Sequence, residues 1–527
     1  MSLSVRMTNM RHIQLYDTTL RDGAQAEGAA FSLQDKLQLA KKLDTLGFDF
    51  IEGGFPGSNE KDAEFFRRIE EQPLATAAVC AFGMTRRKGI KPEEDAGIRS
   101  LLDSQAPIIT IVGKTSAFQV VEIINARLEE NLQMVAETVD FFRKQGRRVF
   151  FDAEHFFDGW KDNPQYSLSI LKTAVEMGVE IVILCDTNGG SMPELIRDGV
   201  QTVVDTVGVP VGIHAHNDCG VAVANSLTAV DAGATQVQGT INGIGERCGN
   251  ANLIAIAANL ALKKQGAYSV LKPDSLLSLT ELSRFVYETI NFQIPLHDPF
   301  VGKSAFAHKG GMHVSGISRN SAAYEHIVPE TVGNSRRVLI SELSGRSNIA
   351  AKTKDLNLDA ETVKKILDEV VLKENQGYQY EVAEGSFDLI VKKCAGTFKE
   401  HFQRLNYHVK VDANKEGVLV TEATVKLQIG NEIRHEVAEG DGPVAALDAA
   451  MRKALVSAYP QLSAMRLIDY KVRVINSEAA TEAAVRVVIE SEDADGNVWG
   501  TIGADENIIE ASWIALADSI EYKLNRA

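Results

Sequence analysis

Two histidines stand at the end of a short extended segment that reads His214-Ala-His216-Asn-Asp218. Side chains at positions i and i+2 of a strand point to the same side, so both imidazoles can reach one metal ion. Paired histidines at this spacing also arise by chance in cores and on surfaces. The segment is therefore a candidate cation site that needs support from elsewhere in the chain.

That support comes from two other segments. Arg21 and Asp22 follow a short β-type run in Asp17-Thr-Thr-Leu-Arg-Asp-Gly-Ala-Gln25, and Asn250 closes Gly243-Ile-Gly-Glu-Arg-Cys-Gly-Asn250. A carboxylate is a hard ligand for a divalent cation, and a guanidinium can hold a carboxylate or a developing oxyanion, although an Arg-Asp pair is often an ordinary loop ion pair. Together the segments predict a mixed nitrogen and oxygen site that leaves room for a bidentate substrate; its ligands would be Asp22, His214, His216 and Asn250.

Two further segments carry polar residues where a strand is expected to end. Asp152-Ala-Glu154-His presents Glu154 as a candidate for proton transfer, and Cys185-Asp-Thr187-Asn-Gly presents Thr187 as a hydrogen-bond partner for a substrate carboxylate. A strand-end salt bridge and a turn cap are the structural alternatives for these two residues.

The elements that must position these residues form a regular series. Short β-branched runs alternate with amphipathic stretches such as 32–46 and 128–145, and eight strands are expected at His12–Asp17, Phe48–Gly53, Thr76–Phe82, Pro107–Val112, Arg148–Glu154, Glu180–Cys185, Pro210–His214 and Thr235–Thr240. Eight strand-helix units favour an α/β fold, a (β/α)₈ TIM barrel, over an open doubly wound sheet. In a barrel the chemistry gathers at the carboxyl ends of the strands, where all the candidate residues above would lie.

The barrel accounts for only part of the chain. We expect an N-terminal tail over 1–10, the barrel over 11–275, helical and irregular linker subdomains over 276–384 and a C-terminal α+β regulatory domain over 385–527. In the last domain a strand pair followed by 442–455 is echoed by a strand pair followed by 503–516. Two ββα-like halves of this kind predict a pseudo-symmetric unit with a groove for a small molecule, or else a plain dimerisation module.

Composition excludes several classes of function. The formal net charge of −16 and the lack of a basic segment with interleaved aromatics argue against nucleic acid as a partner. The cysteines lack paired spacing, so neither a disulfide framework nor a thiolate cluster is indicated: they are Cys80, Cys185, Cys219, Cys248 and Cys394. No apolar run approaches the ~20 residues that span a bilayer. We expect a cytoplasmic protein with no membrane partner.

Three of these motifs carry a family resemblance. Leu-Arg-Asp-Gly-Ala-Gln, His-Ala-His-Asn-Asp and Gly-Glu-Arg-Cys-Gly-Asn-Ala resemble the signatures of the family of 2-isopropylmalate synthase, homocitrate synthase and citramalate synthase. The segments 52–59, 151–159 and 184–190 look most like the citramalate synthase branch. The resemblance covers nearly the whole chain and implies a synthase that condenses acetyl-CoA with pyruvate on the pathway to isoleucine.

The resemblance also implies roles for individual residues. Asp22, His214, His216 and Asn250 would bind a divalent cation, which this donor set allows to be manganese, magnesium, cobalt or zinc. Substrate would be held by Arg21, Gln25, Thr187 and Asn320. The catalytic group would comprise Arg21, Glu154, His313 and Tyr324. The second histidine of His308-Lys-Gly-Gly-Met-His313 would reach the active site of a partner subunit, which implies a homodimer, and isoleucine would act as feedback inhibitor through the C-terminal domain.

Other functions remain open at this point. The runner-up within the family is 2-isopropylmalate synthase, which uses 2-oxoisovalerate, and homocitrate synthase follows it. An acyl-CoA carbon-carbon lyase shares the metal constellation but has little use for a large C-terminal domain. A non-catalytic sensor of an amino acid would not need an intact set of metal ligands.

Overall fold

The computed structural model describes residues 10–339, 349, 353, 356, 358–413, 419–475 and 484–526. These residues divide into two compact units, one made of Met1–Phe306 with Ile327–Ser335 and the other of Ala307–His326 with Arg336–Ala527. Apart from Met10, the expected N-terminal tail lies outside the described residues.

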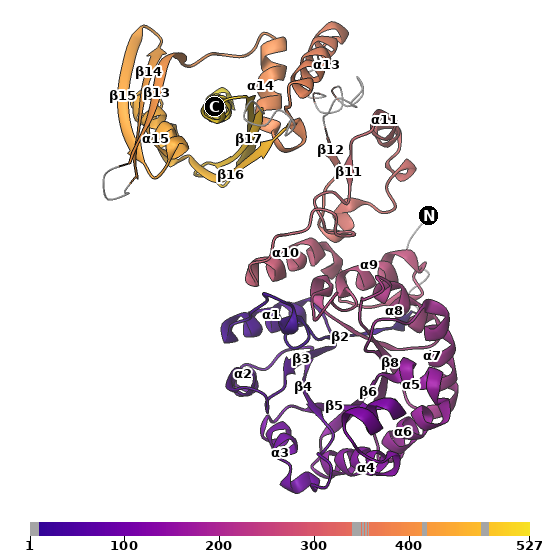
Figure 1. The fold of residues 1–527 in the computed structure, drawn as a ribbon. Coiled ribbons are helices and arrows are strands. Elements are labelled where there is room, and N and C mark those ends of the chain that lie inside the picture. The colour runs from indigo at the N-terminus through magenta and orange to yellow at the C-terminus, as the bar shows by residue number, and fades with distance from the viewer. Residues whose placement is uncertain are drawn as a thin grey trace. The chain divides into compact units, whose positions relative to one another are not determined.

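The first unit is a closed barrel of parallel strands, ringed by helices (Figure 1). The barrel strands are β2 (Gln14–Asp17), β3 (Phe50–Gly54), β4 (Ala78–Met84), β5 (Ile108–Lys114), β6 (Arg148–Glu154), β7 (Ile181–Asp186), β8 (Val211–Ala215) and β9 (Gln236–Gly239). Strand β9 pairs with β2 through Gln14↔Gln236 to Asp17↔Gly239, which closes the ring. The expected TIM barrel is confirmed, and the open doubly wound sheet is excluded.

Helices cover the outside of the ring: α1 (Leu33–Leu46), α2 (Glu60–Glu71), α3 (Ala96–Asp103), α4 (Leu128–Lys144), α5 (Phe156–Asp162), α6 (Pro164–Glu176), α7 (Pro193–Val207), α8 (Ala222–Asp231) and α9 (Leu253–Lys263). Sequence signals set the ends of α1. Ser32 accepts a hydrogen bond from the backbone of Asp35 in a capping box, and Gly47 adopts φ 91° to end the helix.

Apolar side chains fill both faces of the barrel strands, as parallel sheets require. Large residues from neighbouring strands occupy the interior, and the rings of Phe50 and Phe150 pack edge to face with centroids 5.1 Å apart. A larger buried cluster joins the outer strand faces to the helices. The barrel is therefore a packed core, and its polar chemistry is confined to the strand ends and a few interior positions.

The second unit contains two sheets of the same design. Strands β13 (Gln403–Ala413), β14 (Leu419–Ile429) and β15 (Glu432–Gly440) form one antiparallel sheet followed by α15 (Pro443–Leu455). Strands β16 (Arg466–Val474), β17 (Val485–Glu492) and β18 (Val498–Asp505) form the other, followed by α16 (Ile508–Arg526). The expected internal repeat is present, but each half has three strands before its helix, whereas the sequence analysis expected two.

Shorter elements connect the barrel strands to these sheets. They are α10 (Leu279–Thr289) in the first unit and α11 (Gly311–Arg319), α13 (Ala360–Asn375) and α14 (Glu384–Cys394) in the second. Apolar residues of α13 and α14, including Ile366 and Phe387, form a small core with Ile502 of β18. Helix α14 is therefore packed into the C-terminal sheet.

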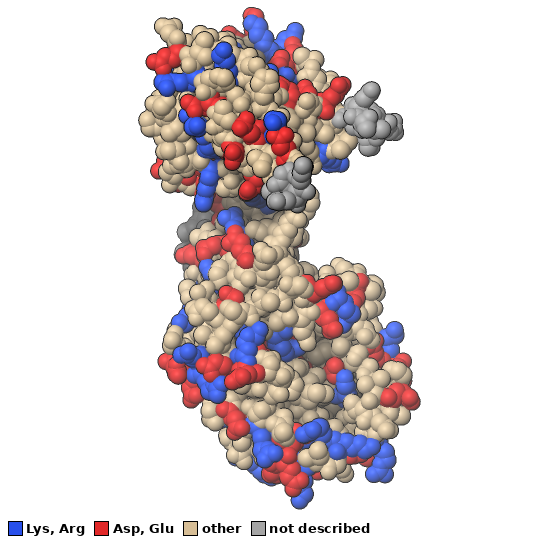
Figure 2. Space-filling view, turned by 60° about the vertical axis from the view of Figure 1, so that its left-hand side comes forward, with Lys and Arg blue, Asp and Glu red and all other residues tan. Residues whose placement is uncertain are grey.

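Among the described residues, no helix combines the length and the apolar character needed to cross a membrane. On the face shown in Figure 2, acidic and basic side chains are interspersed.

Candidate active site

The candidate cation ligands come together at the carboxyl ends of the barrel strands. His214 Nε2 lies 3.4 Å from His216 Nε2, 3.3 Å from the Asn250 amide nitrogen and 3.6 Å from Asp22 Oδ2. All four side chains are buried, with exposed fractions of 8% or less. Backbone pairing holds two of them in place, since His216 and Asn250 form an isolated bridge beyond β8. The structure thus unites residues from three distant segments of the chain.

Burial keeps the two imidazoles neutral. It lowers the pKa of His214, and for His216 burial and the neighbouring His214 lower the pKa to about 3. A neutral imidazole has one nitrogen with a free lone pair, which is the form that binds metals. Two such nitrogens that face each other across 3.4 Å can both serve one ion placed beside them.

Asp22 is turned toward Arg21 in this structure. Its Oδ1 and Oδ2 accept hydrogen bonds from Arg21 Nη1 at 2.5 Å and Nη2 at 3.0 Å. Burial alone would raise the pKa of Asp22, but the positive charge of Arg21 opposes burial, and the pKa lies below its ordinary value. The carboxylate is therefore ionised and able to act as a ligand.

The donor set fits a divalent cation. It offers two neutral imidazoles, an ionised carboxylate and an amide, and Asn250 Oδ1 is buried without a hydrogen-bond partner among the described residues. Within the same described ranges, no group of three or more histidine, cysteine, aspartate and glutamate side chains is already closed around a cation position. Both carboxylate oxygens of Asp22 contact the guanidinium of Arg21, and Oδ2 also lies 3.6 Å from His214 Nε2.

Glu52 is a member of this site that motif reasoning missed. Its side chain is fully buried in the middle of β3, and it accepts one hydrogen bond from Arg21 Nε and another from Tyr16 Oη at 2.9 Å. The guanidinium also lies 3.8 Å from the centre of the Phe82 ring. Arg21 is therefore held from three sides, by Asp22, Glu52 and Phe82.

The remaining candidates of the barrel lie at neighbouring strand ends. Glu154 forms an ion pair with Lys114 at 2.5 Å, and the Thr187 hydroxyl accepts a hydrogen bond from the His155 backbone at 2.9 Å. The contact of Glu154 is the strand-end salt bridge considered above, whereas Thr187 accepts from the backbone after a different strand and is not a turn cap there. Neither contact uses up the group, since Glu154 keeps a second oxygen and Thr187 keeps its hydroxyl proton. Gln25 is exposed and lines, with Arg21, a cavity of about 330 Å³.

A larger cavity, of about 710 Å³, has Glu154 and Lys114 in its lining. Apolar residues such as Met84 and Met134 form much of its wall, and the segment Arg86-Arg87-Lys88 after β4 contributes cationic groups. Arg86 forms an ion pair with Glu137 at 2.5 Å. The Arg87 side chain is 64% exposed and forms an ion pair with Asp95 at 3.2 Å. The cavity thus combines an apolar channel with a basic segment.

His313, Asn320 and Tyr324 belong to the second unit. The rings of His313 and Tyr324 stack with centroids 4.1 Å apart, and Asn320 caps the next helical turn by accepting from the Ala322 backbone at 3.0 Å. His308 and Arg336 both contact Glu325, which ties down the segment on either side. The structure brings these three candidates close to one another, and their approach to a barrel site remains a prediction.

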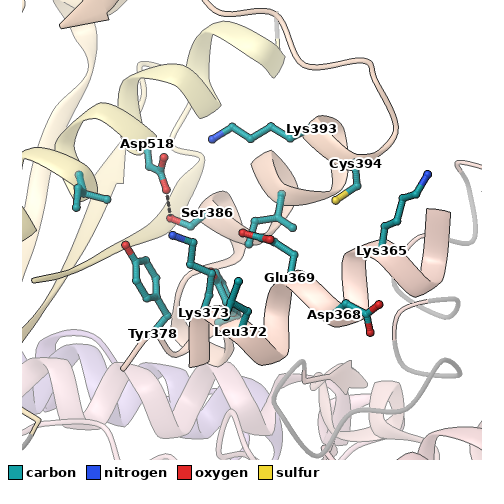
Figure 3. Close-up of a pocket in the computed structure, with 13 residues that line it drawn as sticks. Lys365, Asp368, Glu369, Leu372, Lys373, Tyr378, Ser386, Lys393, Cys394 and Asp518 are labelled. Carbon is teal, nitrogen blue, oxygen red and sulfur yellow. Dashed lines mark hydrogen bonds between the residues drawn. The ribbon is translucent and has the colours of Figure 1, made fainter. Parts of the chain in front are cut away.

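The second unit contains a cavity of its own, of about 610 Å³, between α13, α14 and α16 (Figure 3). Asp518 accepts a hydrogen bond from Ser386 at 2.6 Å in its wall. Lys373 and Lys393 also line it, and in the described part of the chain neither forms an ion pair. Leu372, Ile390 and Ile514 supply an apolar side. The cavity is therefore suited to a small molecule with both a charged and an apolar part.

Comparisons with known proteins agree with the order of these parts. The HMGL-like family model matches residues 12–286, a homocitrate synthase post-HMGL domain-like model matches 300–377, and the LeuA allosteric (dimerisation) domain model matches 381–524. Over 518 residues the chain is 48% identical to the (R)-citramalate synthase of Aquifex aeolicus, covering 97% of this chain and 98% of that one.

Two other relatives extend the comparison. The (R)-citramalate synthase of Geobacter sulfurreducens is 47% identical over 523 residues, covering 98% of each chain. A probable 2-isopropylmalate synthase of Methanopyrus kandleri is 35% identical over 505 residues, covering 95% of this chain and 96% of the relative. The similarity thus reaches across branches and is higher to these two citramalate synthases.

Proposed function

This chain belongs to the HMGL-like family, together with the (R)-citramalate synthases that it matches over nearly their whole length, and we propose that it makes (R)-citramalate from acetyl-CoA and pyruvate. The methyl carbon of acetyl-CoA would bond to the keto carbon of pyruvate, and water would then cleave the thioester to release coenzyme A. Five (R)-citramalate synthases at 40% to 48% identity support this acyltransferase activity.

One geometric observation carries the proposal: two neutral imidazoles, an ionised carboxylate and a guanidinium meet at one end of the barrel. Asp22, His214, His216 and Asn250 would hold a divalent cation, and manganese, magnesium, cobalt and zinc all suit this set. When bound, such a cation supplies Lewis-acid polarisation of a carbonyl group.

The pyruvate would be held by groups around this point. Arg21, fixed by Glu52 and Phe82, would face the oxygen that gains negative charge as the carbon-carbon bond forms. Thr187 would donate a hydrogen bond from its hydroxyl group to the pyruvate carboxylate, since the hydroxyl oxygen already accepts one from the His155 backbone. Gln25 would line the same side of the pocket as Arg21.

The acetyl-CoA would enter along the cavity that begins at Glu154. The apolar wall suits the pantetheine arm, and Arg87 and Lys88 suit the phosphates of coenzyme A. This would place the acetyl methyl group beside the Glu154 carboxylate. Glu154 and His313 would together remove a proton from that methyl group.

His313, Asn320 and Tyr324 would complete the site of a partner subunit in a homodimer. The match to an allosteric (dimerisation) domain supports the dimer. Tyr324 stacks on His313 and would fix the plane of its ring. Mixing a His313→Ala chain with a Glu154→Ala chain should restore activity in the mixed dimer, and a failure to do so would contradict the exchange of His313 between subunits.

The C-terminal domain would bind isoleucine as feedback inhibitor of a cytoplasmic enzyme on the isoleucine pathway. The cavity of Figure 3 supports an effector of this kind, because Lys373 and Lys393 could face a carboxylate while Leu372 and Ile514 face an alkyl group. Isoleucine should lower turnover and raise the melting temperature, and absence of both effects would refute this part of the proposal.

Thiol release from acetyl-CoA tests the activity. The metal-supplemented protein would be assayed with pyruvate, 2-oxoisovalerate and 2-oxoglutarate in parallel. Preference for pyruvate is expected. Preference for 2-oxoisovalerate would favour the second candidate, 2-isopropylmalate synthase, which the 35% identity to the Methanopyrus relative supports. Absence of thiol release with all three acids would refute a synthase.

A further inference from the structure

Three buried polar side chains form a hydrogen-bonded series across the barrel interior. The His214 Nδ1 lies 2.8 Å from Gln238 Oε1, and Gln238 Nε2 donates to Asp152 Oδ1 at 3.1 Å. Gln238 is fully buried and Asp152 is 3% exposed. The series therefore runs from a candidate cation ligand to a carboxyl group that the proposed chemistry does not use.

The backbone fixes two members of the series side by side. His214 on β8 and Gln238 on β9 are register partners in neighbouring parallel strands. Asp152 lies on β6 and reaches Gln238 across the interior of the barrel. Because all three stand on strands of a closed barrel, their separation cannot change much without disrupting the sheet.

The direction of the hydrogen bonds follows from the chemistry of Asp152. Gln238 Nε2 donates to Asp152 Oδ1, an oxygen that can accept whether or not the carboxyl group is protonated, so the Gln238 carbonyl oxygen faces His214. The carbonyl oxygen can only accept, so His214 Nδ1 carries the proton. The lone pair then lies on His214 Nε2, the nitrogen that faces His216 and Asn250.

We propose that Gln238, oriented by Asp152, is a positioning residue that holds His214 in the Nδ1-protonated tautomer and so prepares its Nε2 to bind the cation. This rests on the proposed function, since it takes His214 as a ligand. Partners of this kind orient metal-binding histidines and typically contribute about 10- to 100-fold to metal affinity.

Gln236 provides a matched control. It stands two residues before Gln238 on the same strand and is equally buried, and its amide nitrogen and oxygen have no hydrogen-bond partner among the described residues. A change from glutamine to methionine keeps the length of the side chain and removes its hydrogen bonds. Gln238→Met and Gln236→Met therefore differ only in the contact under test.

The first experiment measures binding of Mn²⁺ alone to the full-length protein, by competition with a fluorescent chelator and without substrates. Gln238→Met should weaken binding by about 10- to 100-fold, whereas Gln236→Met should leave it unchanged. Circular dichroism and the melting temperature verify that both variants fold. Equal affinity of Gln238→Met and the wild type would overturn the proposal.

A double variant tests the direction of the series. In Asp152→Asn/Gln238→Glu the new amide at 152 can donate to the new carboxylate at 238, which can still accept from His214 Nδ1. Mn²⁺ affinity should return to within a few-fold of the wild type, unlike that of Gln238→Met. No recovery in the folded double variant would count against a role through hydrogen-bond direction.

The tautomer itself is the readout that a purely structural role would not move. In ¹⁵N-histidine spectra of the metal-free protein, His214 should show a protonated Nδ1 in the wild type and in the double variant, and a mixed population in Gln238→Met. An unchanged tautomer in Gln238→Met would overturn the proposal even if affinity fell. A wild type that binds no Mn²⁺ would overturn both this inference and the proposed metal dependence, whereas normal wild-type binding with an unaffected Gln238→Met would overturn the inference alone.

Discussion

The guanidinium carbon of Arg21 lies 3.8 Å from the centre of the Phe82 ring, so the charged group is clamped against an aromatic face while its N–H groups point to Asp22 and Glu52. An arginine fixed in this way needs no reorganisation when negative charge develops beside it. In the proposed reaction Arg21 would act on the oxygen that gains negative charge.

Arg21→Ala should therefore lower kcat by about two to three decades with a smaller change in the KM for pyruvate. Steady-state kinetics at saturating metal would show this split. Arg67, an exposed residue of α2 that pairs with Glu64 of the same helix, offers a control through Arg67→Ala. An Arg21→Ala enzyme with normal kcat would contradict the assigned role.

His216→Ala should abolish metal-dependent turnover and leave the fold intact, because the imidazole lies at the end of the barrel and its Nδ1 has no hydrogen-bond partner among the described residues. Metal titration followed by both activity and melting temperature would test this. An active variant that is indifferent to chelation would rule out the four-ligand site.

Glu154→Gln should lower kcat by about two to four decades, because a general acid or base contributes that much and an amide cannot act as either. The KM for acetyl-CoA should change little, because the amide keeps the size of the side chain. Exchange of deuterium into the acetyl methyl group provides a direct measurement; exchange that continues at the wild-type rate in Glu154→Gln would assign the proton to another residue.

Arg87→Met/Lys88→Met should raise the KM for acetyl-CoA about tenfold by removing two cationic groups from the long cavity. The same variant should use acetyl-pantetheine, which lacks the nucleotide phosphates, as well as the wild type does. Lys144→Met, on the exposed face of α4, serves as the control. Equal losses with both thioesters would place the coenzyme A phosphates elsewhere.

Asp518 should make stability depend on pH. Burial raises its pKa to about 6, against opposing contributions from Ser386, Lys393 and Lys373, so the folded state binds the proton more tightly than the unfolded chain does. The contribution of this group to stability is therefore full below about pH 4 and is lost as pH rises toward 6. Asp518→Asn should raise the free energy of unfolding at pH 7.5 by about 1 kcal/mol, after allowance for partial solvent screening, and have little effect at pH 4.

Chemical denaturation at the two pH values measures this difference. Asp388 on α14, a half-exposed carboxylate paired with Lys392, is a suitable control position. An Asp518→Asn variant whose stability relative to the wild type is the same at both pH values would contradict the raised pKa.

The barrel was predictable because its strands are short, buried on both faces and separated by helical periodicity. Every expected barrel strand is present, with ends shifted by up to a few residues; the strand expected at Phe48–Gly53, for example, runs over Phe50–Gly54. Such ends depend on pairing with neighbours that are distant in the sequence. The order of the strand ends also predicts that Asp22 lies near His214, and the two side chains are 3.6 Å apart.

Interior polar residues were harder to identify. Gln236-Val-Gln238 puts two amides on the same side of an otherwise buried strand, which is a visible signal, but nothing local says that one of them contacts His214 and the other contacts no partner. Glu52 likewise stands in a run of apolar and glycine residues, and its bond to Arg21 joins β3 to the turn that follows β2. Such roles are decided by register across the barrel.

The closure of the barrel has a consequence for the newly made chain. Asp22 follows the first barrel strand and Asn250 follows the last, and the two ends meet only when β9 pairs with β2. A nascent chain still lacking β9 on the ribosome has neither the fourth donor nor the Gln238 that orients His214. If these residues bind a cation as proposed, the emerging polypeptide would acquire its full cation affinity in one late step, and metal capture would show that the barrel has closed.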